Sequence, residues 1–184
     1  PGGVYLWGLI LTLVTYPIVN QTVAQRIVGA RSEMDARQGT IASLLMAESD
    51  GVYWILDVRR IQGTPADDER LISETAKADG RDVKIYIEQE PGSSGKIVVD
   101  HYTRRVLKGF SAFGKPSTGD KASRAQPISA AAQNGNVRIL PGRWLPDYLD
   151  ELEAFPAGAH DDQVDATSGA HNALSEPQRL DFVV

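Results

Sequence analysis

The 184-residue chain contains no cysteine, which excludes disulfides, zinc–thiolate sites and thiol catalysis. Its three histidines, His101, His160 and His171, are too few to favour a histidine-rich metal site. An excess of basic residues is also missing: the formal net charge is -5, which argues against a general nucleic-acid coat protein. An enzyme that holds cations in an acidic site, and contacts phosphates through a few local Lys and Arg side chains, is still compatible with this charge.

A long hydrophobic run is lacking too. Val4 to Val19 is apolar and uncharged, but it is shorter than the roughly 20 residues that a membrane-spanning helix needs, and it lacks the basic flank of a signal peptide. We therefore expect no membrane anchor. We divide the chain into an apolar leader of unassigned role (residues 1–25), one globular domain (26–176) and a tail (177–184). Because the sequence begins with Pro1 rather than Met, we expect a fragment or a processed product.

The pattern of apolar residues predicts an α/β protein. Ser49-Asp50-Gly51 joins two runs rich in β-formers, a strong hairpin signal, and Thr64-Pro65 followed by acids marks a helix start. A meander of strands followed by alternating strands and helices predicts a mixed sheet with helices on both faces. The expected strands are 25–31, 40–48, 52–61, 83–87, 110–113 and 137–140, and the expected helices are 64–80, 96–108, 120–134, 144–155 and 160–174.

The most informative stretch is His160-Asp161-Asp162-Gln163-Val164-Asp165-Ala166, which begins the last helix. Asp162 and Asp165 are three residues apart and share one face of a helix, where two anions repel each other. A bound Mg²⁺ or Mn²⁺ would reverse the sign of that interaction, because these ions take carboxylate ligands. The alternative is an acidic first turn that complements the helix dipole.

Glu88 stands at the carboxyl end of the 83–87 strand, where functional groups gather in an α/β sheet. Together with Asp162 and Asp165 it could hold two divalent ions, which stabilise the attacking water and the leaving oxygen of a phosphodiester. A third contribution is expected from the first strand, and Asp35 is the nearest candidate. The alternative for Glu88 is an ordinary surface acid. For Asp57, inside a strand, we prefer an ion pair with Arg59 or Arg60.

Basic residues are grouped locally. Lys121 and Arg124 could contact DNA phosphates, which position a duplex without reading its sequence, or could form a solvated helix face. Lys96 is a further DNA-binding candidate. It ends Gly92-Ser93-Ser94-Gly95-Lys96, which lacks the spacing of a nucleotide-binding P-loop, since Glu90 and Ile97 occupy defining positions.

Between residues 40 and 175 the sequence resembles the C-terminal nuclease domain of the large subunit of tailed-phage terminases. The matching segments, in order, are Tyr53 to Val58, Ile87 to Lys96, Thr118 to Lys121, Arg124-Ala125, Gly135 to Val137, Glu151-Leu152, Phe155-Pro156 and His160 to Ala166. This resemblance implies an RNase H-like fold and cleavage of double-stranded viral DNA during genome packaging. It also implies Mg²⁺ or Mn²⁺ as a cofactor, and the portal protein and the small terminase subunit as partners in the host cytoplasm.

By the same resemblance, Glu88, Asp162 and Asp165 are metal-binding acids, with Asp161 as a neighbour. Family members carry the first acid in an aromatic-Asp run at the end of the first strand, where this sequence offers only Asp35. The ATPase motor of a full-length subunit is not in the sequence, so we expect at most the nuclease half. Two other functions stay open: a catalytically degenerate domain that docks DNA or the portal, and a resolvase-like nuclease of the same fold.

Overall fold

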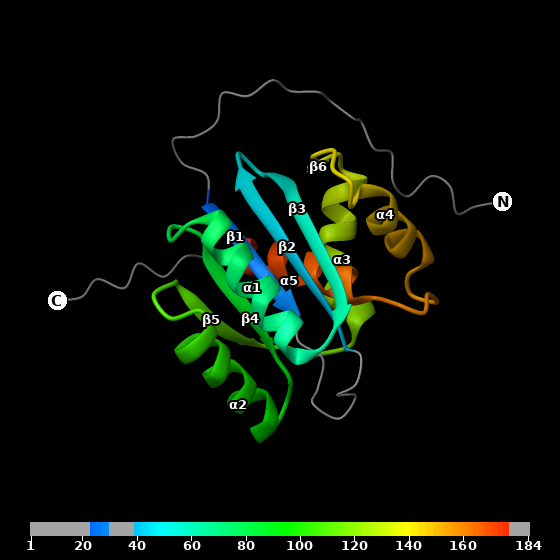
Figure 1. Cartoon of the computed structure of the whole chain (residues 1–184). Coiled ribbons are helices and arrows are strands. Elements are labelled where there is room, and N and C mark those ends of the chain that lie inside the picture. Colours follow the sequence, from blue (N-terminus) through cyan, green and yellow to red (C-terminus); the bar gives the residue numbers. More distant parts are fainter. Residues whose placement is uncertain (1–22, 30–38, 177–184) are drawn as a thin grey trace.

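The computed structural model describes residues 23–29 and 39–176 (Figure 1). The candidate Asp35, the apolar leader up to residue 22 and the tail from residue 177 lie outside the described residues. Among the described residues, no helix is long and apolar enough to cross a membrane.

The described residues form one six-stranded sheet of order β5-β4-β1-β2-β3-β6. β1 pairs antiparallel with β2, and β2 with β3, whereas β1–β4, β4–β5 and β3–β6 are parallel pairs. The predicted mixed sheet is thereby confirmed. The strands are β1 (Val23–Gly29), β2 (Gly39–Ser49), β3 (Val52–Gly63), β4 (Lys84–Gln89), β5 (Ala112–Pro116) and β6 (Val137–Ile139).

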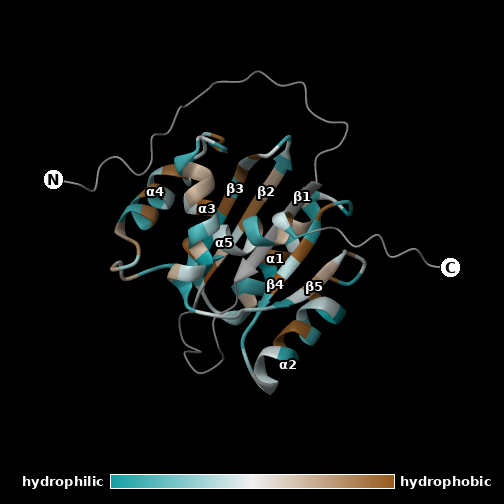
Figure 2. Ribbon diagram, turned by 180° about the vertical axis from the view of Figure 1, so that it is seen from behind, coloured by the Kyte–Doolittle hydropathy of each residue, from teal (hydrophilic) through white to brown (hydrophobic). Residues whose placement is uncertain are grey.

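Helices cover both faces of the sheet, as predicted (Figures 1 and 2). On one face α3, α4 and α5 pack over β2 and β3, and on the other α1 and the end of α2 pack over β2 and β4. The helices are α1 (Pro65–Asp79), α2 (Ser93–His101), its π-helical continuation η2 (Tyr102–Val106), α3 (Lys121–Gln133), α4 (Leu145–Ala154) and α5 (Asp162–Ser175).

Local signals in the sequence account for several of these boundaries. The β2–β3 hairpin turns at Asp50 and Gly51, which both have positive φ (52° and 76°), as its Asp-Gly sequence predicts. Thr64 caps α1 by accepting a hydrogen bond from the backbone N–H of Asp67 (3.3 Å). Asp57 pairs with Arg59 at 2.7 Å, so the ion pair preferred for this strand acid is confirmed.

At two of the boundaries that differ from the prediction, glycines allow close packing. α2 begins at Ser93 rather than Lys96, and a Cβ on Gly95 would lie 2.1 Å from the Glu90 carbonyl oxygen. β5 continues through Gly114, in a stretch expected to be a loop. A Cβ on Gly114 would lie 2.6 Å from Val99 of α2, so this glycine serves strand–helix packing rather than a turn.

Candidate active site

Small residues let α5 approach the sheet closely. Ala166, Ala170 and Ala173 are buried, and they pack in the same cluster as Ala42 and Leu44 of β2. One face of this helix is therefore buried against the sheet. Close approach places the acidic first turn of α5 over the carboxyl end of β4.

Glu88 lies near that end of β4, on the face that α5 covers. Tyr86, two residues earlier on the same face, packs against the α5-side core, whereas Ile85 and Ile87 belong to the core on the other face. In the β4–β5 ladder Glu88 is the partner of Lys115, so an acid and a base are neighbours in the sheet. The Glu88 side chain keeps 26% of its surface exposed.

Two cationic side chains of α3 contact Glu88 and the acids at the start of α5. The Arg124 guanidinium lies 2.7 Å from Asp165 Oδ1 and 3.7 Å from Glu88 Oε1, so it bridges the strand acid and the helix acid. The Lys121 ammonium lies 2.7 Å from Asp161 Oδ1 and 2.9 Å from Asp165 Oδ2. We call these five residues, Glu88, Asp161, Asp165, Lys121 and Arg124, the charged cluster.

The start of α3 fixes where the two cations emerge. Asp120 is the N-cap, and its carboxylate accepts hydrogen bonds from the Ser123 backbone N–H (2.9 Å) and hydroxyl (2.7 Å). Lys121 is thus the first helical residue, and Arg124 follows one turn later on the same side. Arg124 also donates to the Gly119 carbonyl at 3.1 Å, which ties its side chain to the loop before the helix.

The environment of Glu88 disfavours its charged form. Burial raises the pKa of Glu88 above its ordinary value, and the nearby Asp165 carboxylate raises it further. A hydrogen bond from Ser117 and the charges of Arg124 and Lys121 oppose this rise without cancelling it. Burial alone would lower the pKa of Lys121, but its hydrogen bonds to Asp161 and Asp165 raise it overall. The ionised form of Glu88 is therefore poorly stabilised in the charged cluster.

A cavity of about 220 Å³ opens beside Glu88, Asp165 and Arg124. Its lining adds groups that sequence reasoning did not single out. Asn172 continues the Asp165 face of α5, and Lys115, 2.9 Å from Glu176, brings an ammonium to the wall. Periodicity along α5 could have indicated Asn172, but the register of β5 that places Lys115 beside Glu88 is a tertiary feature. The residues that line the cavity are Glu88, Lys115, Pro116, Ser117, Thr118, Arg124, Asp165, Gly169, Asn172 and Glu176.

The structure thus brings together most of the predicted site residues. Asp162 is the first residue of α5, one turn before Asp165, and one of its carboxylate oxygens is buried. Lys96, by contrast, is exposed in the first turns of α2 and is not among the described residues that line the cavity. Asp35 lies outside the described residues, so the first-strand acid stays a prediction.

A second carboxylate, Glu151 of α4, holds the start of α5. It is buried, and it accepts hydrogen bonds from the backbone N–H of Gln163 and from the Gln163 side-chain amide, both at 2.6 Å. One of the free N–H groups at the helix N-terminus is satisfied in this way. Tyr148 of the same helix adds a buried hydrogen bond to Thr167 (2.9 Å). These contacts fix the turn that carries Asp162 and Asp165.

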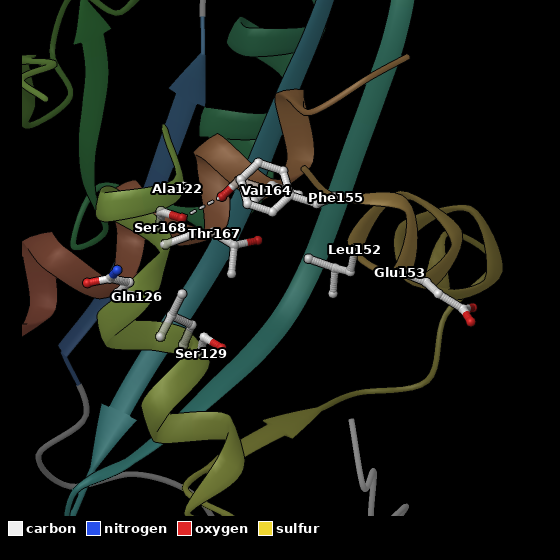
Figure 3. A pocket seen from close by; sticks show the side chains of 11 residues that line it. Ala122, Gln126, Ser129, Leu152, Glu153, Phe155, Val164, Thr167 and Ser168 are labelled. Carbon is white, nitrogen blue, oxygen red and sulfur yellow. Dashed lines mark hydrogen bonds between the residues drawn. The ribbon is translucent and has the colours of Figure 1, made fainter. Parts of the chain in front are cut away.

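A larger cavity, of about 360 Å³, lies between α3, α4 and α5 (Figure 3). Its walls are mostly apolar or neutral, with Leu152, Phe155 and Val164 facing one another across it. Glu153 is the one ionisable side chain among the described residues that line it. Converging charges are absent from that lining, so the smaller cavity is the better candidate for phosphate chemistry.

A mixed sheet of this strand order, with an acid at the end of β4 facing acids on a covering helix, defines an RNase H-like nuclease fold. The comparison with protein-family models identifies the family: residues 33–174 match the terminase RNaseH-like domain. The chain belongs to this family, and its membership supports a nuclease role in viral genome packaging. A comparison with curated protein sequences found no significant match.

Solved structures share the fold. The nuclease domain of the phage P22 large terminase superposes with a TM-score of 0.64 at 11% identity, covering 86% of this chain and 85% of that one. The human cytomegalovirus terminase nuclease domain gives 0.60 at 10% identity, covering 83% of each chain. The large terminase nuclease of thermophilic phage G20c gives 0.55 at 14%, covering 82% of each. At these identities the likeness concerns the fold alone.

Proposed function

We propose that this domain is a metal-dependent endonuclease that cleaves concatemeric double-stranded viral DNA during genome packaging. One observation carries the proposal: Glu88 and Asp165 converge on the Arg124 guanidinium at a cavity beside the carboxyl end of β4, and Lys121 also pairs with Asp165. Family membership supports the packaging role, and a cytomegalovirus relative with this fold was studied soaked with manganese. In the packaging complex the portal protein and the small terminase subunit are the proposed partners.

The donor set fits one divalent ion. Glu88 and Asp165 offer hard carboxylate oxygens, and Mg²⁺ is commonly held by one or two carboxylates together with substrate phosphate. Burial and, second to it, the Asp165 charge raise the pKa of Glu88, and a divalent ion beside both acids would offset these two effects. Among the described residues, no group of three or more acids and histidines is arranged to hold a metal. The two-ion arrangement expected from the sequence therefore requires ligands beyond this set.

When bound, a divalent ion would supply Lewis acidity toward the scissile phosphodiester. Glu88 and Asp165 would hold it, with Asp161 and Asp162 adding negative charge along the first turn of α5. Arg124 and Lys121, which now neutralise the acids, are placed to turn toward DNA phosphates once an ion takes over that role. Lys115 also lines the cavity, but its ammonium is buried and lies 2.9 Å from Glu176, so Lys121 and Arg124 are the better candidates for phosphate contact.

Nicking of supercoiled plasmid in Mn²⁺ tests the proposal. We expect cutting that EDTA abolishes and that Glu88→Gln and Asp165→Asn both eliminate. Asp162→Asn should also abolish cutting while leaving the fold intact, because the resemblance makes Asp162 a metal-binding acid. Folding of each variant is checked by circular dichroism. Cutting that persists in EDTA, or in folded Glu88→Gln protein, would contradict the proposal.

A further inference from the structure

The sheet shows which residue of β1 lies beside Glu88. In the parallel β1–β4 ladder, Val28 is the partner of Ile87, so the next residue of each strand is Gly29 and Glu88. Partners in a parallel ladder share a face of the sheet. The β1 position next to Glu88 is thus occupied by a residue without a side chain.

The pairing of β1 with β2 independently shows on which face of the sheet position 29 lies. Gly29 is paired with Ala42 in the antiparallel β1–β2 ladder, and Ala42 is fully buried in the core beneath α5. Position 29 therefore belongs to the face that α5 covers. When the β1–β4 register is extended by one residue beyond Val28 and Ile87, this row of the sheet contains Ala42, Gly29, Glu88 and Lys115. A carboxylate at position 29 would be the sheet neighbour of Glu88 and would lie beneath the helix that carries Asp165.

We infer that position 29 is a vacant ligand position in the part of the chain that the structure describes, so that the charged cluster by itself holds at most one divalent ion and Gly29→Asp completes a three-carboxylate site. The inference rests on the proposed function only in taking Glu88 and Asp165 as ion ligands. Its physical basis is that ion affinity grows with the number of charged oxygen ligands. Arg124 bridges the two acids that are present, and a third carboxylate would favour a divalent ion over this single charge.

The test is calorimetric titration of the full chain with Mn²⁺, comparing wild type, Gly29→Asp and the isosteric, uncharged Gly29→Asn. We expect Gly29→Asp to bind Mn²⁺ at least about tenfold more tightly than wild type does, or to bind one Mn²⁺ ion more. Gly29→Asn should not, and adding Glu88→Gln to Gly29→Asp should remove the gain. Thermal unfolding without metal verifies that each variant is folded.

A second variant, with the smaller cysteine side chain at position 29, tests the inference if aspartate does not fit there. Because the chain contains no cysteine, Gly29→Cys would carry a unique thiol. Cd²⁺ can probe this thiol, because thiolate is a soft ligand that binds soft metal ions. We expect a thiolate–Cd²⁺ absorption band that weakens strongly when Glu88→Gln is added. A band that is indifferent to Glu88 would show that position 29 does not point into the site.

The outcomes separate this inference from the proposed function. Two Mn²⁺ ions bound by wild type, or equal affinities for Gly29→Asp and Gly29→Asn, would overturn the inference and leave the proposed nuclease standing. No Mn²⁺ binding by wild type, with clear binding by Gly29→Asp, would uphold the inference. That result would also remove the metal step from the proposed function and favour a domain that docks DNA or the portal.

Discussion

Two carboxylates near the start of α5 are held in different ways. Glu151 is 7% exposed and accepts two hydrogen bonds at 2.6 Å from a single residue, the buried Gln163, whose backbone is held in helix α5. Glu88 is partly exposed, and its nearest cation is the long, flexible Arg124 at 3.7 Å. A carboxylate with short bonds to fixed donors serves structure, whereas one facing exchangeable cations can accept a ligand. Burial of an acid therefore does not by itself indicate a role in binding.

The largest expected effect separates activity from stability at the charged cluster. Glu88→Gln or Asp165→Asn should lower plasmid nicking about 100-fold or more, because each removes a proposed ion ligand. Glu88→Gln should not lower the free energy of unfolding appreciably, since it removes a poorly solvated charge. Asp165→Asn should lower it, because it breaks the ion pairs of Asp165 with Lys121 and Arg124. Nicking rates and urea titrations of the same preparations check this. If Glu88→Gln lost stability as well as nicking activity, Glu88 would have a structural role like that of Glu151.

The opposite pattern is expected at Glu151. Glu151→Ala should lower the free energy of unfolding by about 2–4 kcal/mol, because it leaves buried donors of Gln163 without acceptors and opens a gap beside α5. Glu153→Ala, an exposed acid on the same helix, is the matched control and should change it by less than about 0.5 kcal/mol. Equal, small effects in urea unfolding would show that the Glu151 contact contributes little.

A third change probes the chain just after Glu88. Gly95→Ala should destabilise the protein by about 1–3 kcal/mol, since its Cβ would lie 2.1 Å from the Glu90 carbonyl oxygen and force α2 away from β4. Ser94→Ala, exposed in the same turn, is the control. If thermal unfolding shows Gly95→Ala to be as stable as the control, α2 does not fix the end of β4.

The smallest expected effect is on the pH dependence of stability. The pKa of Glu88 is raised in the folded state, so its contribution is fully present below the ordinary value of 4.5 and is lost as pH rises through the folded pKa. Wild type should therefore lose some stability over that range relative to Glu88→Gln. Urea unfolding of both proteins from pH 4 to pH 8 measures the difference. A wild type that gains stability relative to Glu88→Gln over this range would contradict the assigned sign.

Patterns along the chain predicted the order of elements and much of the site. Alternation, hairpin and capping signals are local, and so they identified the strand ending in Glu88 and the helix carrying Asp165. Pairings between distant strands are not local: no pattern near residue 29 or residue 115 indicates that Gly29 and Lys115 flank Glu88. The predicted end of β5 was too early for a related reason, because Gly114 is required by contact with α2 rather than by a turn.

The most direct test of the contrast between the two carboxylates is Mn²⁺-dependent plasmid nicking by Glu88→Gln and Glu151→Gln, at a temperature where both are folded. Both changes remove one charge and keep the shape of the side chain. Our account predicts that Glu88→Gln does not cut, whereas Glu151→Gln cuts at a rate close to that of wild type. Cutting by Glu88→Gln, or loss of cutting in folded Glu151→Gln alone, would contradict it.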